Sequence, residues 1–250
     1  MLSKQTVYKH GKSVTMIVMA AILAAAVILS LMTREEYSEV EVLSGMKSVN
    51  GVFSTDELSI GQILVFGKYE QDGIEENGTE IIQWRVLDID DDKVLLISER
   101  LLDCKPYNEG CEDVTWAECT LRKWLNEDFI NAAFDESDQS KIVLSNIHNP
   151  YNPSFCTAGC ENTDDRVFAL SVDELKKYFQ SDEDKKVEIT RFAATKQRKL
   201  VGYLRSNWWL RTPGSSHSQA TTMSNDGCSL CGWNVDCKYV CVRPAMWVKI

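Results

Sequence analysis

The spacing of apolar and polar residues predicts a three-stranded meander early in the folded region. The runs 62–69, 81–87 and 93–97 are rich in β-branched and aromatic residues. Asp-Gly, Asn-Gly and Asp-Asp-Asp turns separate them, and such turns end strands. We interpret the acidic residues of 88–92 as a solvated hairpin tip, because the glycine and terminal Glu of a calcium loop are missing.

Capping residues predict four short helices in the middle of the chain. Capping boxes stand at 115–118 (Thr-Trp-Ala-Glu) and 171–174 (Ser-Val-Asp-Glu), each before apolar residues at helical spacing. Asn126 and Thr190 are expected to cap two further helices. Beyond Trp208 the pattern returns to strands.

The C-terminal strands are expected at 219–223 and 228–233, joined by an Asn225-Asp226-Gly227 turn, followed by one long strand over 239–250. The sequence therefore predicts an α+β domain of antiparallel strands with short helices.

The N-terminal segment predicts a membrane anchor. Val14 to Met32 is a run of 19 residues without a charge, which as a helix is roughly 29 Å long, close to the thickness of a bilayer core. Lysines precede the run and glutamates follow it, so the positive-inside rule places the N-terminus in the cytoplasm. A cleaved signal peptide and a buried core helix are the alternatives. We expect a cytoplasmic tail (1–13), a transmembrane helix (14–32), a juxtamembrane stalk (33–53) and one extracytoplasmic domain (54–250), with the lipid bilayer as a partner.

The charge of the chain argues against nucleic-acid binding. The formal net charge is −10. Residues 1–32 hold three lysines and no acidic residue, so the remaining 24 basic and 37 acidic residues give 33–250 a charge of −13. Such a domain repels phosphate backbones.

Nine cysteines follow the expected anchor and none precedes it. Outside the cytoplasm this density predicts disulfides, with one thiol left over. A zinc knuckle built from the last four cysteines is the alternative, although the last two are separated by three residues and not by the usual two. The disulfide candidates are Cys104, Cys111, Cys119, Cys156, Cys160, Cys228, Cys231, Cys237 and Cys241.

No catalytic or cofactor motif is recognisable, so we expect no enzyme activity and no cofactor. His148 and His217 lack metal-binding spacing, and a Cys/His pair involving His217 is the remaining catalytic arrangement. Arg211 and Arg243 each stand beside a proline turn and are expected to pair with internal carboxylates or carbonyls, with an anionic ligand as the alternative. Six tryptophans are expected to pack in the core: Trp84, Trp116, Trp124, Trp208, Trp209 and Trp247.

Six segments in fixed order carry a family resemblance: 66–71 (Phe-Gly-Lys-Tyr-Glu-Gln), 82–87 (Ile-Gln-Trp-Arg-Val-Leu), 115–126, 167–171, 208–214 (Trp-Trp-Leu-Arg-Thr-Pro-Gly) and 242–247 (Val-Arg-Pro-Ala-Met-Trp). Over residues 57–250 the chain resembles the bacterial DUF6273 domains. The C-terminal part also resembles C-type-lectin-like folds, including formylglycine-generating-enzyme-like domains. Cys241 departs from the glycine expected before Val-Arg-Pro-Ala, and no calcium-lectin motif is complete.

Together with the expected anchor at 14–32, the lectin-like resemblance implies a membrane-anchored binding or interaction module, with a cell-envelope glycan or surface protein as its partner. An extracytoplasmic thiol-dependent enzyme related to formylglycine-generating proteins is the alternative, and a structural envelope protein is a third. In the lectin-like case the loops between 214 and 240 bind the ligand. The expected ligand-binding residues are His217, Gln219, Trp233, Asn234, Asp236 and Tyr239.

Overall fold

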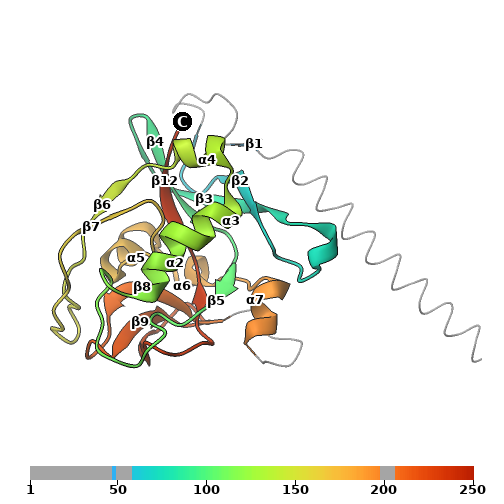
Figure 1. The fold of residues 1–250 in the computed structure, drawn as a ribbon. Coiled ribbons are helices and arrows are strands. Elements are labelled where there is room, and N and C mark those ends of the chain that lie inside the picture. The colour runs from blue at the N-terminus through green and yellow to red at the C-terminus, as the bar shows by residue number, and fades with distance from the viewer. Residues whose placement is uncertain (1–46, 49–57, 198–205) are drawn as a thin grey trace, which may run out of the picture. The chain divides into compact units, whose positions relative to one another are not determined.

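A computed structural model describes residues 47–48, 58–197 and 206–250 (Figure 1). One folded unit runs from Lys47 to Ile250. The expected anchor at 14–32 lies outside the described residues. Within them, no helix has both the length and the apolar character that crossing a bilayer requires.

The first sheet contains the expected meander. Its strand order is β1-β2-β3-β4-β12. The strands are β1 (Lys47–Ser48), β2 (Ile63–Tyr69), β3 (Glu80–Asp90), β4 (Lys93–Ser98) and β12 (Ala245–Lys249). All neighbours are antiparallel except β1 and β2. β1 lies in the segment expected to be a stalk, so the sheet begins before residue 54.

The second sheet gathers the C-terminal strands in the order β10-β9-β8-β11-β5. Its members are β5 (Asp103–Cys104), β8 (Trp208–Pro213), β9 (Gln219–Met223), β10 (Leu230–Asn234) and β11 (Cys241–Val242). The hairpin expected around Asn225-Asp226-Gly227 is confirmed between β9 and β10. Its turn needs glycine, because Gly227 has a φ of +76°.

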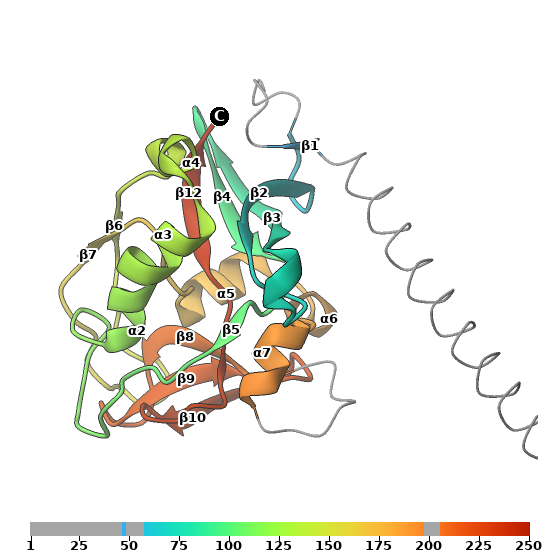
Figure 2. The ribbon, with the colours of Figure 1, turned by 45° about the vertical axis from the view of Figure 1, so that its right-hand side comes forward.

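The single strand expected over 239–250 is wrong. It is split at Arg243 and Pro244, so that β11 belongs to the second sheet and β12, which is labelled beside β4 in Figure 2, belongs to the first. Pro244 has no N–H for a ladder, and its carbonyl instead accepts a hydrogen bond from the Ser98 amide at 3.0 Å. The last twelve residues therefore join the two sheets.

Short helices and a ribbon, β6 (Ser145–Ile147) with β7 (Thr163–Asp165), complete the α+β fold. The capping box at Ser171 and the cap at Thr190 are confirmed. The helices are η2 (Glu75–Asn77), α2 (Thr120–Trp124), η3 (Leu125–Phe129), α3 (Ile130–Ala133), α4 (Glu136–Lys141), α5 (Val172–Tyr178), α6 (Asp182–Lys185) and α7 (Arg191–Lys196).

The other two expected helix starts are wrong. The segment 115–118 is a turn, and α2 begins at Thr120 with the Cys119 sulfur as its cap. Asn126 starts no helix, because α2, η3 and α3 follow one another without a break. Its side-chain amide instead donates to the carbonyls of Arg122 (3.0 Å) and Val167 (2.9 Å). A tertiary contact with Val167 thus takes the Asn126 side chain away from the expected cap.

The tryptophans pack as expected in four of six cases. Trp84, Trp116, Trp208 and Trp209 are at most 2% exposed. The remaining two, at positions 124 and 247, are only partly buried at the margin of the core.

Candidate functional site

A narrow pocket lies where three loops meet beside β8 and β9. The loops are 107–116 after β5, 149–160 between β6 and β7, and 213–219 between β8 and β9. The free volume of about 10 Å³ leaves room for about one water molecule. Its apolar lining includes Val114, Trp116, Pro150, Ala158 and Pro213, and its polar lining includes Thr115, Asn149, His217 and Gln219.

Hydrogen bonds fix the three loops to one another. The Val114 amide donates to the His217 carbonyl at 3.0 Å. His217 Nε2 lies 2.8 Å from the Ala158 carbonyl, which only accepts, so Nε2 carries the proton. The Thr157 hydroxyl donates to the Gly214 carbonyl at 2.8 Å. Loop 213–219 is therefore hydrogen-bonded to both of the other loops that line the pocket.

Arg211 lies in the wall of the pocket with every N–H already engaged. Nε donates to Asn149 Oδ1 at 3.1 Å. Nη1 donates to the Ala169 carbonyl (2.8 Å) and to Glu174 Oε2. Nη2 donates to the His148 carbonyl (2.8 Å) and to Glu174 Oε1 (2.9 Å). Because a guanidinium has five N–H donors, none is left for an anionic ligand.

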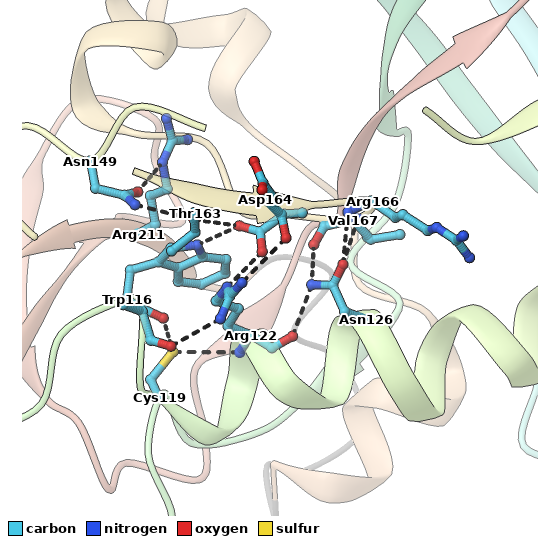
Figure 3. Close-up of polar contacts among 12 residues, drawn as sticks. Trp116, Cys119, Arg122, Asn126, Asn149, Thr163, Asp164, Arg166, Val167 and Arg211 are labelled. Carbon is cyan, nitrogen blue, oxygen red and sulfur yellow. Dashed lines mark hydrogen bonds and ion pairs between the residues drawn. The ribbon is translucent and has the colours of Figure 1, made fainter. Parts of the chain in front are cut away.

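The buried carboxylate of Asp165 connects Trp116, Thr163 and Arg122, which are labelled in Figure 3. Asp165 is fully buried and accepts from Trp116 Nε1 (2.9 Å), Thr163 Oγ1 (2.8 Å) and Arg122 Nε (2.6 Å). Asn149 Nδ2 extends the network by donating to Thr163 Oγ1 at 3.2 Å. Helix α2 thereby fixes two residues that line the pocket, Trp116 and Asn149.

Tyr107 and Cys119, which also lie near the pocket, are uncharged at neutral pH. Burial raises the pKa of Tyr107 well above its ordinary value, and its hydroxyl donates to the Arg211 carbonyl at 2.9 Å. Burial also raises the pKa of the Cys119 thiol to about 12. Cys119 is therefore no nucleophile at neutral pH.

The structure separates the expected ligand-binding residues. His217 and Gln219 line the pocket. Asn234 lies directly opposite Gln219 in the β9–β10 register, whereas Trp233 lies opposite Ala220 and thus on the other face of the sheet. Asp236 and Tyr239 follow β10 and are exposed, and neither they nor the two β10 residues line the pocket. Their role in binding stays a prediction.

The expected cross-linking is confirmed for one cysteine pair. Cys104 and Cys241 form a disulfide between directly opposed residues of β5 and β11. The cysteine that replaces the expected glycine thus fixes the second sheet, and it is unavailable to the zinc knuckle considered above. The other seven cysteines, all among the described residues, are not bonded to one another: Cys111, Cys119, Cys156, Cys160, Cys228, Cys231 and Cys237.

Arg243 is as deeply buried as Arg211, but its guanidinium has fewer hydrogen-bond partners. Nε donates to the Ser98 carbonyl at 3.0 Å, and the guanidinium carbon lies 5.3 Å from the Phe179 ring centre and 5.2 Å from that of Trp208. Nη1 has no hydrogen-bond partner among the described residues. The expected pairing of Arg243 with internal acceptors is thus confirmed for one of them, the Ser98 carbonyl.

One group of carboxylates lies close enough together to be compared with a metal site. Oxygens of Glu70, Asp72 and Glu80 lie within 4.8 Å of one another, and the described residues contain no other such group. Glu80 accepts from the Gln71 amide (2.7 Å) and Asp72 from the Ile74 amide (2.7 Å). Both hydrogen bonds are donated by amides of the connection between β2 and β3, so these carboxylates stabilise that connection.

Comparison with known families agrees with the motif order. A family model described as a domain of unknown function (DUF6273) matches residues 91–250. The chain belongs to this family. No curated protein and no solved structure matches it. The matched range contains all three pocket loops but begins only at the β3–β4 turn, later than the residue 57 expected from the motifs.

Sequence reasoning missed most of the pocket. Tyr107, Asn149 and Ala158 come from loops without a recognisable motif. Thr115 and Trp116 lie in a Thr-x-x-Glu pattern, but this pattern predicts a helix cap and not a pocket.

Proposed function

We propose that residues 58–250 form a binding module that takes a small, neutral substituent of its ligand into the pocket. The saturation of Arg211 carries this proposal, since the one positive charge in the pocket wall is neutralised by Glu174 and has no free donor. The wall then offers apolar surface, with Thr115 and Gln219 as polar groups.

A cell-envelope glycan suits this chemistry. The methyl group of an acetamido substituent matches the size of the pocket and the apolar character of Trp116, Pro150 and Pro213. Its amide can bond to the Thr115 hydroxyl. We extend the expected lectin-like fold and its use of loops for recognition to this site as part of the same proposal.

Glycan-array screening of the purified chain, followed by titration of paired variants, tests the proposal. Thr115→Ala with Gln219→Ala should weaken binding more than tenfold, about 1.4 kcal/mol, at an unchanged melting temperature. Trp233→Ala with Asp236→Ala is the matched control outside the pocket. Loss of binding only in the control pair would move the site to the loops after β10 and overturn the pocket proposal.

We also propose that 14–32 anchors the module outside the cytoplasmic membrane. The charge asymmetry of its flanks supports this topology. Protease added to intact protoplasts should digest residues after Arg34, and the protein should stay with membranes after a carbonate wash. A soluble product that begins near Val27 would identify a cleaved signal peptide instead.

A thiol-dependent enzyme is the second candidate, because Cys160 and His217 line the same pocket. A catalytic thiol should react with iodoacetamide faster than the exposed Cys111, and its alkylation should abolish turnover. Buried Cys119 is the unreactive control. Equal or slower labelling of Cys160 would contradict this candidate.

A further inference from the structure

The outer edge of the second sheet, strand β10, is unusually open. Among the described strands it pairs only with β9, whereas the opposite edge strand, β5, packs against α7. Leu230 and Trp233 of β10 are each 40% exposed. The strand has no charge, no proline and no bulge in its pairing with β9, which are the usual protections of an edge.

Two hydrogen bonds show which backbone groups face outward. The Ser224 amide donates to the Ser229 carbonyl (2.9 Å), and the Val235 amide donates to the Ser218 carbonyl (3.0 Å). Bonded pairs alternate along an antiparallel ladder. The odd-numbered residues of β10 therefore bond to β9, and the even-numbered residues point their N–H and C=O groups away from it.

The outward residues are Leu230, Gly232 and Asn234. The carbonyl of Asn234 also accepts from the Cys237 amide at 3.0 Å. Gly232 is the centre of this row and has no side chain to hinder an approaching backbone.

We propose that β10 pairs with β10 of a second copy of this chain, antiparallel and about a two-fold axis through Gly232. Gly232 then bonds to its symmetry mate, and Leu230 bonds to Asn234 on either side. The two second sheets become one continuous sheet.

The side chains and charges fit this register. Cys231 of one copy lies opposite Trp233 of the other, which brings a sulfur beside an exposed ring. No charge lies within Leu230–Asn234, so the seam brings no like charges together although the domain is acidic. Beyond the strand, antiparallel order brings the turn that holds Asp226 towards the segment of the other copy that holds Asp236 and Lys238, where the lysine offsets part of the acidic charge.

Cross-linking of the full chain tests the register. In this pairing positions 231 and 233 form a non-hydrogen-bonded pair with Cα atoms about 4.5 Å apart, within disulfide range. Trp233→Cys should therefore give a disulfide-linked dimer on a non-reducing gel. The wild-type chain should not link through Cys231, because its mate lies diagonally at about 7–8 Å. Adding Cys231→Ser to Trp233→Cys is the matched control, and equal cross-linking in that variant would overturn the register.

Sedimentation of the wild-type chain and two Gly232 variants tests the association itself. Gly232→Pro removes an outward N–H and no bond to β9, whereas Gly232→Ala keeps the N–H. A β-carbon at this position meets only the flexible end of Gln219, at 2.9 Å from Oε1, so both variants should fold. The dimer association constant should fall more than tenfold in the proline variant only. A wild-type chain that stays monomeric, or a proline variant that associates as well as the alanine variant, contradicts the proposal.

Discussion

Arg211 and Arg243 are two buried arginines with opposite solutions to the same problem. Each is 2% exposed and each stands beside a proline turn. Arg211 has a carboxylate, a side-chain amide and two backbone carbonyls as partners. Arg243 has one carbonyl and two aromatic rings. One residue type thus serves once as a polar clamp and once as a filler between rings.

The difference lies in which segments each side chain connects. Glu174 pairs with Arg211 and also accepts from the Ser171 amide as part of the α5 capping box, so one carboxylate joins α5 to β8. Burial removes the Arg243 guanidinium from water and lowers its pKa to about 9; the negative charge of Glu99 opposes this shift, and the positive charge of Arg85, which is bonded to Glu99, adds to it. A clamp is sensitive to loss of its partners, whereas a filler is sensitive mainly to shape.

The largest effect is expected from Arg211→Met. The substitution leaves Glu174 without its cation and several buried acceptors without donors, and removal of one partner from a buried pair typically costs about 3–5 kcal/mol. Urea unfolding measures the change. A loss below about 1 kcal/mol would show that the network does not depend on the guanidinium.

The adjacent residues Trp208 and Trp209 also differ in their hydrogen-bond partners. The expected difference in unfolding free energy between their variants is about half the loss expected from Arg211→Met. Both are fully buried, but Trp209 Nε1 donates to the Lys105 carbonyl at 2.8 Å, whereas Trp208 Nε1 has no partner among the described residues. Both lose similar volume on replacement by phenylalanine. Trp209→Phe should therefore destabilise the protein by about 1–3 kcal/mol more than Trp208→Phe in thermal or urea unfolding. Equal losses of unfolding free energy in the two variants would mean that the hydrogen bond from Trp209 Nε1 to the Lys105 carbonyl does not contribute to stability.

Cys119, near the Arg211 clamp, predicts a pH dependence. Its pKa is raised by burial from 9.0 to about 12, so the unfolded chain loses this proton first. Its contribution to stability is complete below about pH 9 and falls as the pH rises from about 9 to about 12. Between pH 8 and pH 10 the free energy of unfolding should fall by about 1.4 kcal/mol more in the wild type than in Cys119→Ala. Parallel pH profiles would contradict the shift.

The smallest effect is expected from Arg243→Met. Methionine fills the space between Phe179 and Trp208 and removes a buried charge that has no carboxylate directly bonded to it. The change in unfolding free energy should stay within about 1 kcal/mol, because apolar replacements of buried charges are often neutral. A loss as large as that of Arg211→Met would erase the distinction between the two sites.

Local chemistry predicted the elements better than the site. The meander and the caps at Ser171 and Thr190 depend on neighbouring residues, so the pattern suffices. Thr115 and Asn126 also carry local cap signals, but neither begins a helix. For Asn126 distant partners decide the outcome, because its side-chain Oδ1 accepts from the backbone amides of Arg166 (2.8 Å) and Val167 (3.2 Å).

The pocket was harder to predict because its three loops meet only after folding. Of the six expected ligand-binding residues, only His217 and Gln219 line it. Alternation along β10 sends Trp233 to the other face of the sheet, and Asp236 and Tyr239 follow the end of that strand. Nothing in the two local sequences distinguishes the roles of Arg211 and Arg243, because the segments that surround each side chain lie far away in the chain.

Titration with matched neutral and acidic oligosaccharides tests the central claim, that the saturated Arg211 leaves a pocket for neutral groups. N-acetylglucosamine oligomers and oligomers of equal length that alternate with glucuronate are compared at low and high salt. The account predicts that the neutral oligomer binds at least as tightly, with an affinity that salt does not change. Tighter binding of the acidic oligomer, weakened by salt, would contradict it.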